Sequence, residues 1–317
     1  MKELFKNCLR VEERDGWLVP LRFTEHQMQV YTSNEARLIR SNAPSSVILS
    51  FKSAAKKISF RYRITGKARD WASVDVVCDG VLTESINLVD DSGFLEIELS
   101  GDVNVETHIY LPHLVCFALR DITSDAPLIP TENKRKTWLA LGDSITQGMV
   151  AKRASGAYPS LISERFDLGV INAGVGGIRF DVTELDYIGF EPDIITVALG
   201  CNDWGIPKEQ LKLNVSSYLE RLVSIYKCRN IHLILPTWRS DFEEQNAEMT
   251  FAEHREVIRE VAARYSFINI VDGYNLVPHL ADYFGDPPDL KVHPNDEGFL
   301  RYAFALTKHV NFMPSVL

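Results

Sequence analysis

The sequence predicts an all-β sandwich followed by an α/β domain with a parallel sheet. Residues 17–129 contain short runs of β-branched and aromatic residues separated by turn signals, as in a sandwich. A segment with two prolines and several charges, 124–136, follows and has the composition of an interdomain linker. Beyond it, strand patterns alternate with helix patterns, which is typical of a parallel sheet covered on both faces. At 317 residues and 45% hydrophobic content, the chain is long enough to bury two such cores.

The strand-like runs of the first region are "SVILSFKS", "KISFRYRI", "SVDVVCDGVL", "GFLEIELS" and "ETHIYLPHLVCFAL". No long helical pattern interrupts them. We place the boundary near residue 132, so that an accessory domain spans 1–132 and a second domain spans 133–317.

The second region carries five strand patterns, at 137–142, 168–173, 193–200, 230–237 and 267–273. Helix patterns lie at 157–166, 207–227, 246–265 and 295–310. Five strands alternating with helices predict a flavodoxin-like, doubly wound sheet.

Composition and charge exclude several classes of protein. The net charge of -9 argues against binding to a nucleic-acid backbone, which relies on clustered Lys and Arg. The five cysteines are scattered without any CxxC spacing, so we expect neither a disulfide framework nor a zinc site. The first 17 residues interrupt their apolar positions with charges, and no later run approaches the roughly 20 apolar residues that span a bilayer. We therefore expect a cytoplasmic protein with no membrane partner.

Polar residues and glycines follow the first three strands of the predicted parallel sheet, and one histidine stands in a late loop. Because sites in such sheets collect at the carboxyl ends of the strands, we expect these residues to meet. Ser144 follows the first strand and is the candidate nucleophile, with His293 of "LKVHPNDEG" as its base. The N–H groups of Ser144 and Gly177 and the side-chain amide of Asn202 are the candidate oxyanion donors.

The segments "GDSITQG", "INAGVGG", "GCND" and "HPN" resemble, in this order, the four sequence blocks of the SGNH or GDSL-type hydrolases. The resemblance covers about residues 137–310 and implies the roles just given. In the second block, Gly174 or Gly176 is an alternative to Gly177. An all-β domain ahead of such a hydrolase is similar to two-domain carbohydrate esterases, which implies a jelly-roll-like sandwich.

One position departs from the family pattern. The family usually has an aspartate three residues before the histidine, and here that position is Leu290. The acidic candidates are Asp289 and Asp286, and we expect Asp289 to orient His293. Without such an acid, the site would be a Ser-His dyad oriented by a backbone carbonyl.

Further residues near the predicted site have two interpretations. Trp204 and Trp238 follow the third and fourth strands, where they would bind substrate by stacking on a sugar or would pack in the core or rim. Asp143 and Asp203 are expected to hold their loops through backbone hydrogen bonds. The remaining histidines have no metal-ligand spacing, so we predict no metal and no cofactor.

The residues and the resemblance together predict a metal-independent serine esterase or deacylase that works through an acyl-enzyme. Its small-molecule substrate would be a short-chain ester, with acetyl favoured, of a carbohydrate or small alcohol. One alternative is an acyltransferase that passes the acyl group to an acceptor alcohol. Another is a carbohydrate-binding protein with a decayed hydrolase domain, which the Leu290 irregularity would support.

Overall fold

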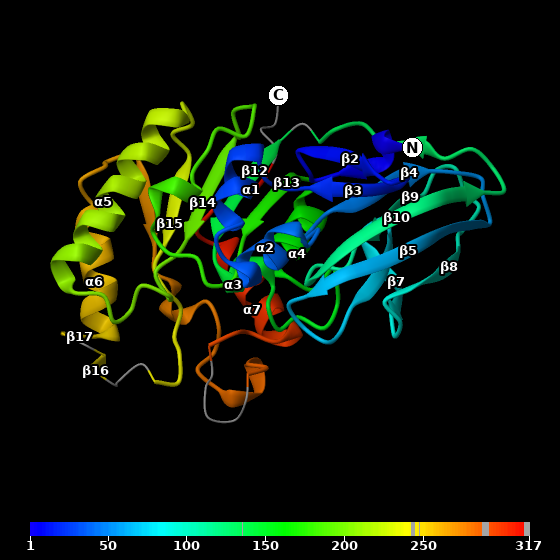
Figure 1. The fold of residues 1–317 in the computed structure, drawn as a ribbon. Coiled ribbons are helices and arrows are strands. Elements are labelled where there is room, and N and C mark those ends of the chain that lie inside the picture. Colours follow the sequence, from blue (N-terminus) through cyan, green and yellow to red (C-terminus); the bar gives the residue numbers. More distant parts are fainter. Residues whose placement is uncertain (135, 242–244, 247, 287–291, 314–317) are drawn as a thin grey trace.

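The computed structural model describes residues 1–317 except 135, 242–244, 247, 287–291 and 314–317. Figure 1 shows two sheet-containing regions side by side. The N-terminal strands form the right-hand region, and the parallel sheet with its helices forms the left-hand region. The change from antiparallel to parallel pairing falls between β11 (Ile129–Pro130) and β12 (Thr137–Gly142).

The described N-terminal strands form two antiparallel sheets. In the first, the strands are ordered β1 (Phe5–Lys6), β4 (Ile48–Lys52), β9 (Glu106–Tyr110), β6 (Ser73–Cys78) and β7 (Val81–Asn87), with β11 also paired to β4. In the second, they are ordered β2 (Arg10–Arg14), β3 (Trp17–Leu21), β10 (Val115–Ser124), β5 (Lys57–Lys67) and β8 (Ser92–Glu98). The apolar faces of both sheets share one core, which includes Phe51 of β4 and Phe60 of β5, so the predicted sandwich is confirmed.

The N-terminal region differs from the prediction in two respects. Strands β1 and β2 precede Trp17, where the predicted strand pattern begins. Two short helices, α1 (Glu25–Tyr31) and α2 (Glu35–Asn42), follow β3. Each begins at a side-chain cap, with Thr24 and Gln27 forming a capping box for α1. Helices of two turns give too few apolar repeats for periodicity to reveal them.

The second region contains a five-stranded sheet within the described residues, and all its strand pairs are parallel. The strand order is β13 (Gly169–Gly174), β12, β14 (Ile194–Ala198), β15 (Ile231–Ile234) and β18 (Ile268–Val271). The first strand of this region therefore lies between the second and the third. This is the flavodoxin-like order, and it confirms the predicted fold class.

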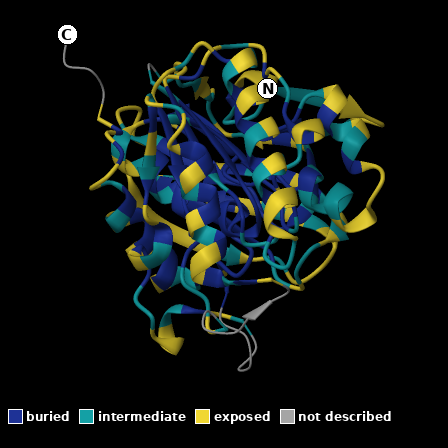
Figure 2. Ribbon diagram, turned by 90° about the vertical axis from the view of Figure 1, so that its left-hand side faces the viewer, coloured by how far each residue is buried: buried dark blue, intermediate teal, exposed yellow. Residues whose placement is uncertain are grey.

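Helices cover both faces of the parallel sheet. The helices of this region are α3 (Ser144–Gln147), α4 (Tyr158–Phe166), α5 (Lys208–Ile225), α6 (Phe251–Ala262) and α7 (Asp296–Leu306). Along β12, Leu139 packs in one core with α5 and α6, whereas its neighbour Trp138 packs in the other with α4 and α7. Figure 2 shows the buried strands between outer helices whose exposed side chains face away. Burial of both faces explains the nearly continuous apolar sequence of these strands.

The remaining described elements are short. They are the strand pair β16 (Gln245–Asn246) and β17 (Met249–Thr250), and the 3-10 turns Lys2–Leu4, Val182–Glu184, Gly273–Asn275 and Ala281–Tyr283. Among the described helices, none is long and apolar enough to cross a membrane.

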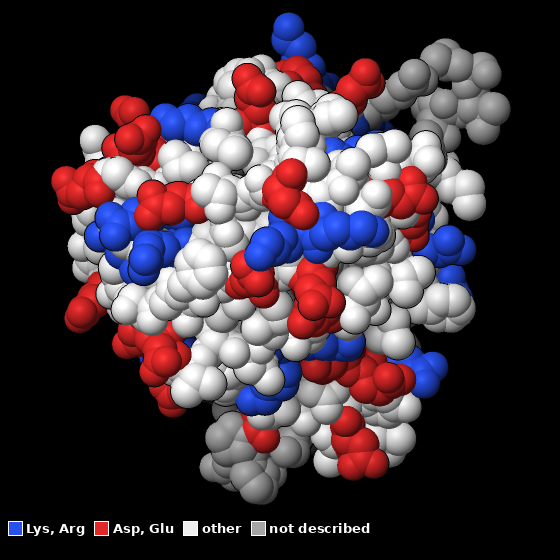
Figure 3. Space-filling model, turned by 90° about the vertical axis from the view of Figure 1, so that its right-hand side faces the viewer, with Lys and Arg blue, Asp and Glu red and all other residues white. Residues whose placement is uncertain are grey.

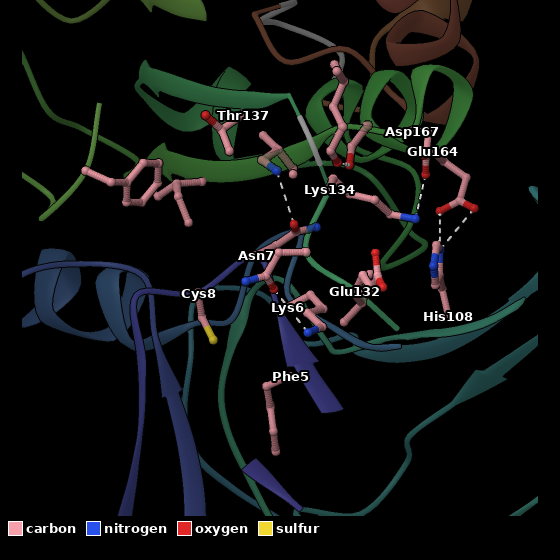
Figure 4. A pocket seen from close by; sticks show the side chains of 18 residues that line it. Phe5, Lys6, Asn7, Cys8, His108, Glu132, Lys134, Thr137, Glu164 and Asp167 are labelled. Atoms are coloured by element: carbon pink, nitrogen blue, oxygen red, sulfur yellow. Dashed lines mark hydrogen bonds and ion pairs between the residues drawn. The ribbon is translucent and has the colours of Figure 1, made fainter. Parts of the chain in front are cut away.

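The two regions meet at the amino ends of β12 and β13 around a cavity of about 280 Å³. Figure 4 shows charged side chains from both regions on its wall. His108 of β9 lies 2.9 Å from a Glu164 carboxylate oxygen, and Lys134 lies 2.5 Å from Asp167. On the outer face of the N-terminal region, acidic and basic side chains are interspersed (Figure 3).

Candidate active site

The register of the parallel sheet brings three strand ends together. Gly142, the last residue of β12, is paired with Gly174 of β13 on one side and with Ala198 of β14 on the other. The segments that follow these three residues therefore leave the sheet at the same edge. Ser144, the turn at 175–177 and Asn202 all lie within four residues of such an end.

Ser144 is the first residue of α3, and the cap of this helix is its neighbour. The Asp143 carboxylate accepts the N–H of Ile145 at 2.9 Å. Because Asp143 caps the helix, the Ser144 hydroxyl is available for another partner, and it lies 2.8 Å from Nε2 of His293. The Ser144 residue is 8% exposed, so the hydroxyl is close to solvent but mostly enclosed.

A carboxylate lies on the other side of the His293 ring, and it belongs to Asp286. The Asp286 Oδ1 atom is 2.7 Å from Nδ1 of His293, and Oδ2 accepts the N–H of Val292 at 2.6 Å. Asp289, the predicted acid, lies outside the described residues. The carboxylate that the structure places on His293 is thus the one seven residues earlier in the chain.

The two aspartates at the site are perturbed in opposite directions. Burial by itself raises the pKa of Asp286, but the hydrogen bonds and charge of His293 prevail and lower it from its ordinary value. For Asp143, burial prevails over its hydrogen bond to Ile145 and raises the pKa to about 6. Asp286 is therefore suited to remain ionised and to stabilise a protonated His293.

The turn after β13 carries three glycines, and their N–H groups have different partners. The Gly174 N–H donates to Oδ1 of Asn172 at 3.0 Å, and the Gly176 N–H donates to Oε1 of Gln147 at 2.9 Å. The hydrogen bonds of the described residues include none from the Gly177 N–H. Of the three alternatives, Gly177 is the one with a donor available to an oxyanion.

Two of these glycines are required by their geometry. Gly177 has a φ of +86°, in the left-handed region that side chains disfavour. At Gly174, an added Cβ atom would lie 2.4 Å from the backbone nitrogen of Gln147, so a side chain there would push α3 away from β13. Gly174 thus keeps the turn close to α3, and Gly177 gives the turn its left-handed backbone.

The side chain of Asn202 lies beside this turn. Its Nδ2 group donates to the carbonyl oxygen of Ile178 at 2.9 Å and has a longer contact of 3.5 Å with Asp143. The first bond fixes the amide, while the second is at the limit of hydrogen-bonding distance and leaves one N–H weakly used. The Asn202 amide is therefore held between the turn and Asp143, close to Ser144 in the chain fold.

The two tryptophans pack against other aromatic rings. Trp204 meets Phe251 edge to face at a centroid distance of 5.2 Å, and its indole nitrogen donates to the carbonyl oxygen of Met249. Trp238 stacks on His279 at 5.1 Å and packs at an angle against Phe284. These contacts support the packing interpretation, and one face of Trp238 is already covered by His279.

Asp203 and Cys201 stand on either side of Asn202, and their surroundings limit what each can do. The buried Asp203 accepts the N–H of Phe180 at 3.2 Å and so holds the third loop, as expected. Burial raises the pKa of the Cys201 thiol, which makes it a poor nucleophile. The described residues contain no cluster of His, Cys, Asp and Glu suited to a metal ion.

Sequence reasoning missed the residues that brace the glycine turn. Asn172 and Gln147 bind its N–H groups, and arginines from the N-terminal region bind its carbonyl oxygens. Asn172 and Gln147 stand inside the quoted blocks "INAGVGG" and "GDSITQG", so their position was a usable signal. The arginines lie more than 130 residues away in the chain, where no local pattern marks them.

The model of the GDSL-like lipase/acylhydrolase family matches residues 140–300. The chain belongs to this family. A second model, described as the N-terminal domain of SsfX3, matches residues 4–120. No curated protein sequence matches this chain.

Solved structures with the same fold span both regions. The salicylyl-acyltransferase SsfX3 from a tetracycline biosynthetic pathway has a TM-score of 0.83 at 20% identity and covers 96% of this chain and 93% of its own. A putative GDSL-like lipase from Bacteroides ovatus has a TM-score of 0.66 at 17% identity, with 97% and 95% covered. A family two carbohydrate esterase from Clostridium thermocellum, solved with cellohexaose, has a TM-score of 0.61 at 13% identity, with 83% and 90% covered.

Proposed function

We propose that this protein is a serine esterase or deacylase that removes a short acyl group, with acetyl favoured, from a carbohydrate or small alcohol. The observation that carries the proposal is the continuous hydrogen-bonded chain from Ser144 through His293 to Asp286. Distances of 2.8 and 2.7 Å are those expected of a nucleophile, a base and an orienting acid. In this proposal, Asp286 takes the role first expected of Asp289.

The reaction follows from these contacts. His293 Nε2 removes the proton of Ser144 as Oγ attacks the ester carbonyl carbon, and the carbonyl π electrons move to the oxygen. The N–H groups of Ser144 and Gly177 and the Asn202 amide bind this oxyanion. Collapse of the tetrahedral intermediate breaks the bond to the alcohol oxygen, which takes the proton from His293. Water then attacks the acyl-enzyme by the same steps and releases the acid.

The contact of Asp286 with His293 argues against the alternative of a carbohydrate-binding protein with a decayed hydrolase domain. That alternative depended on the missing acid three residues before His293. With Asp286 on Nδ1, the site has all the groups that acyl transfer requires, and we set the alternative aside.

The test of the nucleophile is replacement of Ser144 by alanine. We expect p-nitrophenyl acetate hydrolysis by the purified protein to fall by about 10,000-fold or more. Cys201→Ala is the matched control, because Cys201 directly precedes Asn202 and burial raises the pKa of its thiol, and it should retain activity. If Ser144→Ala hydrolyses as fast as the wild type, the proposed function is wrong. A panel of acyl esters of increasing chain length, run beside acetylated sugars, then identifies the acyl and alcohol parts.

A second candidate function is acyl transfer to an acceptor alcohol. It is favoured by the similarity to a salicylyl-acyltransferase over nearly the whole chain, including the N-terminal region. The two functions differ only in what attacks the acyl-enzyme. Product analysis with increasing concentrations of an acceptor alcohol separates them, because a transferase forms the new ester in preference to the free acid.

We also propose that residues 1–132 form an accessory domain that completes the active site rather than a separate binding module. Support comes from α1 and α2, which lie between the sandwich and the parallel sheet (Figure 1). The Gln27 side chain of α1 donates to the carbonyl oxygen of Glu184, and Arg37 of α2 forms an ion pair with the Glu184 carboxylate.

A further inference from the structure

Three arginines of the N-terminal region reach the glycine turn that follows β13. Each donates from its guanidinium to a main-chain carbonyl oxygen of this turn. The pairs are Arg22 with Gly174 at 3.2 Å, Arg40 with Gly176 at 2.8 Å, and Arg37 with Gly177 at 3.1 Å. Three carbonyl groups of the segment 174–177 are therefore held by side chains from another part of the fold.

The bond from Arg40 acts on a particular peptide group. The carbonyl of Gly176 and the N–H of Gly177 belong to the same planar amide. A cationic donor on the carbonyl oxygen fixes the plane of this amide and polarises it, which strengthens the N–H as a donor. Among the hydrogen bonds of the described residues, none is donated by that N–H.

The contact is close and is braced from two sides. A Cβ atom added to Gly176 would lie 3.2 Å from Nε of Arg40, so the arginine side chain covers this residue. The main-chain oxygen of Arg40 accepts from Nε2 of Gln147 at 2.9 Å, and Oε1 of Gln147 accepts the Gly176 N–H. Arg40, the turn and the helix of the nucleophile are thus linked in one hydrogen-bonded ring.

The charge of Arg40 is not neutralised by a neighbouring carboxylate. Arg37 forms an ion pair with Glu184 at 2.8 Å, whereas no ion pair among the described residues includes Arg40. Its Nε atom is buried without a hydrogen-bond partner. Burial, with repulsion from Arg69 and Arg37, lowers the pKa of Arg40, although the group stays protonated at neutral pH. The Arg40 guanidinium beside the oxyanion donors stabilises the negative charge that develops on the carbonyl oxygen as the tetrahedral intermediate forms.

We propose that Arg40 is a positioning residue of the oxyanion hole, which orients and polarises the Gly176–Gly177 amide from the N-terminal region. This inference rests on the proposed acyl-enzyme function. It assigns the N-terminal region a part in the chemical step, in addition to any part in substrate binding. Since the oxyanion exists only in the transition state and the intermediate, Arg40 should affect kcat and leave KM nearly unchanged.

The test compares Arg40→Met and Arg40→Lys with the wild type in p-nitrophenyl acetate hydrolysis. Arg40→Met removes the donor and the charge, and we expect kcat to fall about tenfold to thirtyfold with KM within about twofold. Arg40→Lys keeps the charge and should recover part of the loss. The second readout is inhibition by a boronic acid, whose tetrahedral adduct with Ser144 places an oxygen in the oxyanion hole. Its affinity should fall in parallel with kcat.

Arg120→Met is the matched control, because Arg120 is an N-terminal arginine that packs over Trp17 of the sandwich. It should leave kcat and boronate affinity unchanged. The inference is overturned if Arg40→Met has wild-type kcat, or if kcat falls while boronate affinity stays the same. If Arg40→Met does not fold, Arg40→Lys decides: equal losses in kcat and boronate affinity support the inference, and an unchanged boronate affinity overturns it. If the proposed acyl-enzyme function is itself wrong, Ser144→Ala will retain hydrolysis. This result distinguishes failure of the proposed function from failure of the Arg40 inference.

Discussion

The N-terminal region contacts the parallel-sheet region at both ends of the strands, and the two contacts differ in their chemistry. At the amino ends, side-chain ion pairs join the regions, as between His108 and Glu164. At the carboxyl ends, arginines bind main-chain carbonyl oxygens, as Arg40 binds Gly176, although one of them, Arg37, also forms an ion pair with Glu184. The first contact pairs charge with charge. The second leaves the charge of Arg40 without a carboxylate partner in the described structure.

The difference indicates what each contact does. Paired charges such as Lys134 with Asp167 neutralise each other. At the carboxyl ends, burial raises the pKa of Asp143 to about 6 and that of Asp203 to about 7, so this end carries groups in unfavourable surroundings. Carboxyl groups whose pKa is shifted in this way are concentrated at functional sites. Substitutions at the carboxyl ends should therefore change kcat, and substitutions at the amino ends should change the free energy of unfolding.

The largest effect is expected from Asp286→Asn. Without the carboxylate, His293 loses both the orientation of its ring and the charge that stabilises its protonated form. We expect kcat to fall about 10,000-fold, as when the acid of a Ser-His-Asp triad is replaced. Steady-state kinetics on p-nitrophenyl acetate measures this, with the melting temperature as evidence that the variant is folded. A variant with wild-type kcat would instead indicate a Ser-His dyad.

The next effect is expected from Asn202→Ala, which removes one oxyanion donor. We expect kcat to fall about 100-fold to 1,000-fold, with KM changed little, because the donor acts mainly on the transition state. The lost bond to Ile178 should also lower the free energy of unfolding, by about 1 kcal/mol. A rise in KM at constant kcat would contradict the role, since it would assign Asn202 to ground-state binding.

At the amino ends, His108→Gln should change stability and leave kcat unchanged. Burial by itself lowers the pKa of His108, but hydrogen bonds and charge from Glu106 and Glu164 prevail and raise it to about 9 from 6.5. Such a group stabilises the fold fully below pH 6.5, and its contribution is lost as pH rises through 9. We expect the variant to be about 3 kcal/mol less stable than the wild type near pH 6, with the difference shrinking towards pH 10.

Urea denaturation of both proteins at several pH values measures this difference. The comparison is necessary because other titratable groups, present in both proteins, also change charge over this pH range. The difference between the two curves of unfolding free energy against pH gives the contribution of the His108 charge. A difference that does not depend on pH would show that the ring contributes by packing alone.

The smallest effect is expected from Tyr110→Phe. The Tyr110 hydroxyl donates to Glu164 at 2.7 Å, and its removal takes one hydrogen bond from the same ion-pair network. We expect a loss of about 1.5 kcal/mol in the free energy of unfolding, because the acceptor is charged. The kcat should equal that of the wild type. A reduced kcat would show that the contact at the amino ends also affects catalysis, which contradicts the difference proposed between the two contacts.

The sequence by itself determined the fold class and singled out Ser144 as the candidate nucleophile. The strands of the parallel sheet were found to within a few residues, because burial on both faces makes them apolar and turn residues mark their ends. Ser144 and His293 were found because the blocks around them are local in sequence. The placement of Ser144 beside His293 agrees with the prediction, and the catalytic roles remain proposals.

Only the tertiary structure decided that Asp286 contacts His293, and that the Gly177 N–H makes no hydrogen bond among the described residues. Both Asp286 carboxylate oxygens accept hydrogen bonds from Val292 or His293, and sequence spacing alone does not predict these contacts. Gly177 differs from Gly174 and Gly176 in its positive φ and in the partners of its N–H group. The N–H partner of Gly174 is the nearby Asn172, whereas Gln147, which binds the Gly176 N–H, and Arg40 come from other segments of the chain. Local patterns specify elements and motifs, whereas contacts between distant segments depend on how the elements pack.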